Sequence, residues 1–159
     1  MAHCPGCGVS IPNEEEIDKK YNALVACVTL CGEASFYTLS LGDSYFIHQL
    51  LVDTYAAQHA GPIVKPISTA FALIGLYLIF EKNYTGREVQ KAHMILAQKN
   101  KQWPHFILPS EKARLTVQDV VQAQDSEKQE MIKKWGKAVW DIWKAEHEQV
   151  INLTARYLF

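Results

Sequence analysis

The sequence predicts an all-α protein, a single-domain bundle of five or six helices. Apolar residues recur at spacings of three and four along most of the chain, whereas no segment alternates every second residue over a useful length. The chain has 159 residues, 48% of them hydrophobic and 21% charged, which is an ordinary globular composition for one domain. We therefore expect residues 1–159 to form one helical domain.

The helical pattern and the residues that start and stop helices together predict six helices: 18–40, 43–60, 66–81, 87–99, 116–124 and one from 126 onward. The second has Asp43 as its N-cap and ends at Gly61-Pro62. The third is apolar on nearly every face, so we expect it at the centre of the bundle. The last carries Trp135, Trp140 and Trp143, which we interpret as core residues rather than as an aromatic platform for a ligand.

The charge pattern does not favour a nucleic-acid or membrane partner. Residues 1–62 carry two basic and seven acidic side chains, and residues 63–159 carry 14 and 10, interleaved rather than clustered. The longest apolar run, at 69–80, is shorter than the roughly 20 residues that span a bilayer. Because the first residues show no signal peptide and the chain has four cysteines, we expect a cytoplasmic protein in a reducing compartment. The sequence does not identify which protein or small molecule is the partner, and it does not determine the oligomeric state.

The clearest motif is Cys4-Pro-Gly-Cys7-Gly, within a segment at 1–16. Two cysteines on a tight glycine-containing turn direct both thiolates to one point, which is typical of a zinc knuckle. A structural zinc needs four ligands, and the remaining candidates are Cys27, Cys31, His48, His59, His3 and His147. A redox Cys-x-x-Cys is the competing interpretation, but it needs a βαβ setting for which the sequence offers no strand pattern.

Helix geometry ranks the candidates, if the first two helices form an antiparallel hairpin that turns near residues 41–42. Cys27 lies about 14 residues before that turn and His59 about 17 after it, so their levels differ by only about 4–5 Å. His48 lies opposite Ser35, roughly 12 Å from the level of Cys27, which is too far for one ion. In the alternative interpretation the helical cysteines are small core residues. The predicted zinc ligands are Cys4, Cys7, Cys27 and His59.

A second set of polar residues, His48, Asp53 and Tyr55, shares the predicted second helix with His59. These three residues could line the pocket of a metal-dependent or His/Asp-assisted hydrolase. We favour the alternative, in which His48 is a hydrogen-bonded core histidine and Asp53 ties neighbouring helices together. The sequence thus predicts a zinc-binding helical protein that acts as a binding or regulatory module, with a structural metal, and it leaves open whether the protein is an enzyme.

Several of these strings resemble an uncharacterised bacterial family, a domain of unknown function. The most specific string is His-Gln-Leu-Leu-Val-Asp-Thr-Tyr-Ala-Ala-Gln-His-Ala-Gly at 48–61, which accompanies the Cys-Pro-Gly-Cys-Gly turn. The resemblance covers nearly the whole chain, and it implies no activity. According to this resemblance, the residues that stand at the family's marked positions are Cys4, Cys7, Cys27, His48, Asp53 and His59. One departure is Ala72, which stands where the family tends to have a histidine, and this weakens any site that pairs such a histidine with His48.

Overall fold

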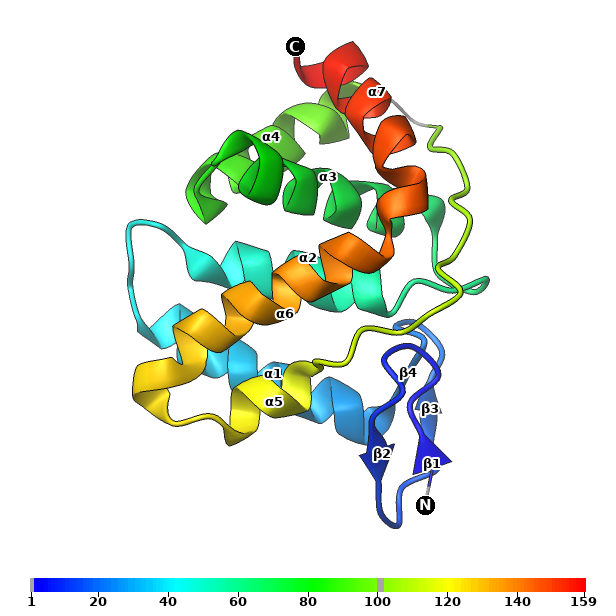
Figure 1. Ribbon diagram of the computed structural model, residues 1–159, viewed down its shortest axis with the longest axis vertical. Coiled ribbons are helices and arrows are strands. Elements are labelled where there is room, and N and C mark those ends of the chain that lie inside the picture. The colour runs from blue at the N-terminus through cyan, green and yellow to red at the C-terminus, as the bar shows by residue number, and fades with distance from the viewer. Residues whose placement is uncertain (1, 100–101) are drawn as a thin grey trace.

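The computed structural model describes residues 2–99 and 102–159, which are helical over most of their length (Figure 1). The helices are α1 (Val25–Ser40), α2 (Ile47–Gln58), α3 (Pro66–Lys82), α4 (Gly86–Lys99), α5 (Val117–Gln122), α6 (Lys128–Ile142) and α7 (His147–Leu158), with short 3-10 turns η1 (Asp125–Glu127) and η2 (Lys144–Glu146). Four two-residue strands precede them: β1 (Ala2–His3), β2 (Ser10–Ile11), β3 (Ile17–Asp18) and β4 (Ala23–Leu24). The described part of the chain is therefore mostly helical, as predicted, with two small hairpins at its start.

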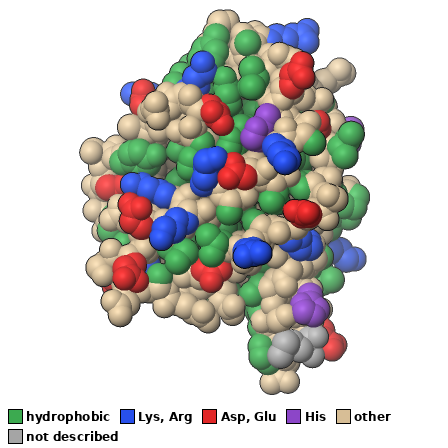
Figure 2. Space-filling model, viewed as in Figure 1, with side chains coloured by type: hydrophobic (Ala, Val, Ile, Leu, Met, Phe, Trp, Pro, Cys, Tyr) green, Lys and Arg blue, Asp and Glu red, His purple; other side chains and the backbone are tan. Residues whose placement is uncertain are grey.

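Helices α2 and α3 form the centre of the bundle. Helix α2 contacts α1, α3, α4 and α6, while α3, α4 and α7 form a layer on one side of it (Figure 1). Helix α3 is buried at nearly every position from Thr69 to Ile79, which confirms the central place that its apolar sequence predicts. No helix of the described residues is both long and apolar enough to cross a bilayer. Basic and acidic side chains are intermixed on the face shown in Figure 2.

The tryptophans of the last third of the chain belong to the core, as predicted. Trp135, Trp140 and Trp143 are 0–2% exposed. Each indole N–H has an acceptor: Trp135 donates to the Gln58 side chain at 2.9 Å, and Trp140 donates to Glu81 at 3.0 Å. Trp143 donates to a backbone carbonyl of α2 at 3.3 Å. These contacts join α6 to α2 and α3, because a buried indole needs a partner for its polar edge.

The predicted first helix is too long at its start. Strands β3 and β4 and the turn between them occupy residues 17–24. Ile17 pairs with Leu24 and Asp18 pairs with Ala23, so α1 begins only at Val25. The turn between them contains Asn22 in the left-handed region, with φ of 50°, a conformation that asparagine tolerates better than most residues. A two-residue strand is too short to show alternation, so periodicity could not reveal this hairpin.

The predicted last helix is in fact two helices, so the described chain has seven rather than five or six. Helix α6 ends at Ile142, and η2 separates it from α7. The backbone carbonyl of Trp140 accepts hydrogen bonds from the Trp143 N–H at 3.1 Å and from the His147 ring at 2.8 Å. The His147 ring also stacks on Trp140, with centroids 3.6 Å apart. These contacts take the carbonyl that the next helical turn would use, and they place His147 at this junction.

Candidate metal centre

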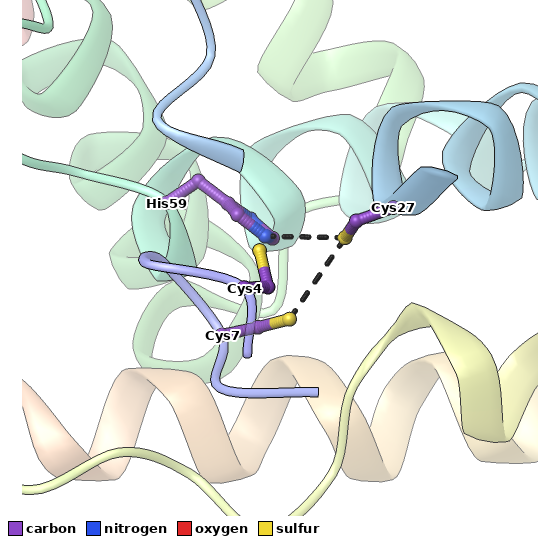
Figure 3. A group of neighbouring side chains, drawn as sticks. All are labelled: Cys4, Cys7, Cys27 and His59. Atoms are coloured by element: carbon purple, nitrogen blue, oxygen red, sulfur yellow. Dashed lines mark hydrogen bonds between the residues drawn. The ribbon is translucent and has the colours of Figure 1, made fainter. Parts of the chain in front are cut away.

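Four side chains from three parts of the chain converge beside the N-terminal hairpins (Figure 3). The turn between β1 and β2 supplies two cysteines, the first turn of α1 supplies a third, and the end of α2 supplies a histidine. They are Cys4, Cys7, Cys27 and His59, and their ligand atoms all lie within 4.8 Å of one another. The structure therefore brings together the two cysteines of the Cys-Pro-Gly-Cys-Gly motif and the two residues that helix-hairpin geometry selects from the sequence, Cys27 and His59.

The cysteine turn is shaped by its own backbone. The Cys4 N–H donates to the Val9 carbonyl and the Gly8 N–H donates to the Cys4 carbonyl, each at 2.9 Å. Gly8 has a φ of 83°, a conformation that side chains disfavour. Gly6 is required for a different reason, because a Cβ there would overlap the His59 ring and lie 2.8 Å from the Asn22 carbonyl oxygen. The glycines thus let the turn close and let His59 approach it.

The imidazole of His59 is held with one nitrogen facing the cysteines. Its Nδ1 lies 2.7 Å from the Tyr55 carbonyl oxygen, so Nδ1 carries the proton and donates it there. Nε2 then keeps its lone pair and lies 3.5 Å from Cys27 Sγ. The Tyr55 ring stacks on the imidazole with centroids 3.9 Å apart, and its hydroxyl donates to Cys27 Sγ at 3.4 Å. Contacts of this kind orient metal-binding histidines.

Two of the distances between ligand atoms match those expected around a tetrahedral ion. Tetrahedral zinc, with Zn–S near 2.3 Å and Zn–N near 2.0 Å, separates two sulfurs by roughly 3.8 Å and a sulfur from a nitrogen by roughly 3.5 Å. Cys7 Sγ lies 3.8 Å from Cys27 Sγ, and Cys27 Sγ lies 3.5 Å from His59 Nε2. All four side chains are at most 3% exposed. The residues present therefore fit a closed site with four protein ligands.

The three thiols cannot all ionise without a cation. The pKa of Cys4 is lowered because its thiolate accepts hydrogen bonds from the Cys27 and Cys7 thiols. The pKa of Cys27 is raised because its thiol donates to those two sulfurs and is buried. The hydrogen bond with Cys27 lowers the pKa of Cys7, but the bond to Cys4 and burial outweigh it and raise this pKa to about 12. A bound divalent cation would supply the charge that lets all three become thiolates.

A lysine far along the chain supports the cysteine turn. Lys112 Nζ donates to the Pro5 carbonyl oxygen at 2.9 Å and to the Gly6 carbonyl oxygen at 2.6 Å. Lys112 lies in the irregular segment before α5, which passes over the hairpins in Figure 1. The sequence carries no signal for this contact, because a single lysine in a loop has no preferred distant partner.

The three candidate catalytic residues have different partners. His48 Nδ1 lies 2.9 Å from the Thr38 hydroxyl, and burial lowers the pKa of its ring. Tyr55 is turned toward the cysteines, as described above. Asp53 accepts a hydrogen bond from the Gln49 side chain at 3.2 Å and lies on α2 facing α3 and α4. Among the described residues, no hydrogen bond joins the three residues into one group.

Asp53 instead meets His93 of α4, a residue that the sequence did not single out. The His93 Nε2–H donates to the Phe71 carbonyl at 2.8 Å, while Nδ1 accepts from Gln49 at 3.4 Å. Burial raises the pKa of Asp53 well above its usual range and lowers the pKa of His93. Both shifts favour the neutral forms of the two side chains, whose His93 Nε2 and Asp53 Oδ2 atoms lie 3.7 Å apart. Ala72, which stands where the resemblance marks a histidine, lies on α3 and is 1% exposed.

One protein family matches this chain, over residues 2–144, and its description is Family of unknown function (DUF5946). The comparisons with curated proteins and with solved structures gave no match. The matched residues include helices α1–α6 and the whole Cys/His cluster. The chain therefore belongs to the DUF5946 family, a family of unknown function.

Proposed function

We propose that the protein is a zinc-stabilised helical module for binding or regulation, and that the zinc has a structural role. The observation that carries the proposal is the closed site of four buried side chains, in which three cysteines and one histidine point to a common centre. Thiolate and imidazole are the ligands that zinc prefers, and four protein ligands are typical of structural sites.

The proposed zinc would connect three separate parts of the chain at one point. Strands of two residues are too short for independent stability, so the hairpins depend on their attachment to α1 and α2. Cys7 and Cys27 are 20 residues apart, and Cys27 and His59 are 32 apart. A metal bound by all of them would fasten the cysteine turn and the two helices at one point, and its binding free energy would contribute to folding.

A hydrolase with a pocket near His48, Asp53 and Tyr55 is the alternative, and the geometry favours it less. A catalytic zinc keeps a position for water or substrate, which four buried protein ligands do not provide. A catalytic base would also need access to substrate, whereas Asp53 is only 3% exposed.

The test compares His59→Ala with His48→Ala, two substitutions on the same helix. Zinc content, measured by mass spectrometry of the native protein, should fall from about one per chain to well below one in His59→Ala and remain unchanged in His48→Ala. Chelation should lower the thermal midpoint of the wild-type chain. A metal-free preparation that is folded and as stable as the zinc-loaded one would overturn the structural role.

A further inference from the structure

A groove opens directly beside the proposed metal centre. Its volume is about 780 Å³, within the range of cavities that hold small molecules. Helices α1 and α2 and the segment that leads into α3 form its walls. His59 belongs to both the groove and the Cys/His cluster, and Tyr55, which lines the groove, contacts the cluster through Cys27. Large apolar side chains that line it are exposed: Tyr21 at 41%, Val52 at 38% and Ile63 at 55%.

A glycine in the middle of α1 keeps this groove open. Glycine inside a helix costs about 0.5–1 kcal/mol relative to alanine, so it usually has a packing reason. Gly75 and Gly136 have one, because a Cβ would lie within 2.8 Å of Asp53 Cγ and 2.9 Å of Leu50 Cδ1, respectively. A Cβ on Gly32 would meet nothing within 4 Å. Its missing side chain leaves space in the groove that it lines.

The charge of the groove is positive. Lys20 and Lys65 are its charged lining residues, and no Asp or Glu side chain lines it. Among the described residues neither lysine forms an ion pair with a carboxylate. Lys65 is also the N-cap of α3, so the positive end of that helix dipole adds to the potential there. The groove thus joins apolar walls to two cations without anionic partners.

From these features we propose that the groove binds a small amphipathic anion, an apolar molecule carrying one carboxylate or sulfonate group. The apolar part would cover the exposed apolar side chains that line the groove, and the anionic group would lie between Lys20 and Lys65. This proposal names the ligand class of the binding module proposed above, and it therefore rests on that proposed function. Because Tyr55 touches Cys27 and forms a wall of the groove, metal binding would also fix the shape of the groove.

The experiment uses two fluorescent probes of nearly the same apolar shape, anilinonaphthalene sulfonate and the uncharged N-phenylnaphthylamine, with the zinc-loaded chain. The sulfonate should bind at about one site per chain, at least tenfold tighter than the uncharged probe, and be displaced by dodecanoate. Gly32→Leu fills the groove and should weaken sulfonate binding at least tenfold. Thr29→Leu adds the same side chain to an exposed position of α1 outside the groove lining, and it should bind as the wild type does.

The charge is tested separately with Lys20→Gln combined with Lys65→Gln. This variant should lose the preference for the sulfonate while its affinity for the uncharged probe stays the same. No single-site binding by the wild type, or equal binding by Gly32→Leu, would overturn the groove proposal, provided that Gly32→Leu keeps the wild-type thermal midpoint. If Gly32→Leu is destabilised, the test depends on the double lysine variant alone: unchanged preference for the sulfonate in that variant would overturn the groove proposal. Zinc content of the same samples separates the proposals: zinc without probe binding refutes only the groove, and probe binding by a stable zinc-free chain refutes only the metal.

Discussion

The same substitution at two helical glycines, Gly32→Ala and Gly75→Ala, should change stability in opposite directions. Both glycines lie inside helices, so alanine should gain about 1 kcal/mol of helix propensity at either position. At Gly32 the new methyl group meets nothing within 4 Å, so the gain should appear as added stability. At Gly75 the methyl group overlaps the buried carboxyl of Asp53 and lies 3.2 Å from Val89 Cγ1.

Overpacking of a buried contact costs about 1–3 kcal/mol and, with both neighbours buried, we expect Gly75→Ala to lie at the upper end of that range. After the propensity gain is subtracted, the net loss should be about 1–2 kcal/mol. The two variants should therefore differ by about 2–3 kcal/mol in the free energy of unfolding. For a chain of this length that is a difference of roughly 4–12 °C in thermal midpoint.

Urea denaturation of the zinc-loaded variants, followed by circular dichroism, measures the difference directly. Thermal midpoints from the same samples provide a second estimate. If both variants are stabilised equally, α3 does not pack against Asp53 as closely as the structure has it. If Gly32→Ala is destabilised, Gly32 has a packing role, and its missing side chain does not serve the groove.

Two further predictions concern Asp53 and Lys112. Burial raises the pKa of Asp53, so as pH rises above about 4 the unfolded chain ionises first and the native state loses stability relative to it. Asp53→Asn should therefore increase in stability relative to the wild type between pH 4 and pH 7 in urea titrations, and parallel pH profiles would contradict this. Lys112→Met removes two hydrogen bonds to the cysteine turn, and a colorimetric chelator should remove zinc about tenfold faster. Unchanged release kinetics would show that Lys112 does not support the site.

The helical pairing behind the Cys/His cluster could be predicted from sequence because it depends on few quantities. Helices have a fixed rise, so once α1 and α2 are antiparallel, positions equally far from their turn must lie side by side. That constraint brought Cys27 and His59 to one level and separated His48 from them, as the structure has it. The apolar sequence of α3 likewise determined its central place, because a helix without a polar face needs neighbours on all sides.

What could not be predicted depends on contacts between distant parts of the chain. Lys112 reaches the cysteine turn across more than 100 residues, and His93 meets Asp53 from another helix. Neither contact leaves a periodic pattern in the sequence. The hairpin at 17–24 could not be predicted because strands of two residues are too short to show an alternating pattern. The break after α6 depends on how His147 packs on Trp140. In each case tertiary contacts, rather than local propensity, decide the structure.

The most direct test of the proposed metal centre is X-ray absorption spectroscopy at the zinc edge on the purified, untagged protein, with metal content measured on the same sample. We predict about one zinc per chain, coordinated by three sulfurs near 2.3 Å and one nitrogen near 2.0 Å, with no oxygen ligand. These would be the atoms of Cys4, Cys7, Cys27 and His59. A folded protein without bound metal, or a zinc shell that contains a water oxygen in place of one of these ligands, would contradict the closed structural site.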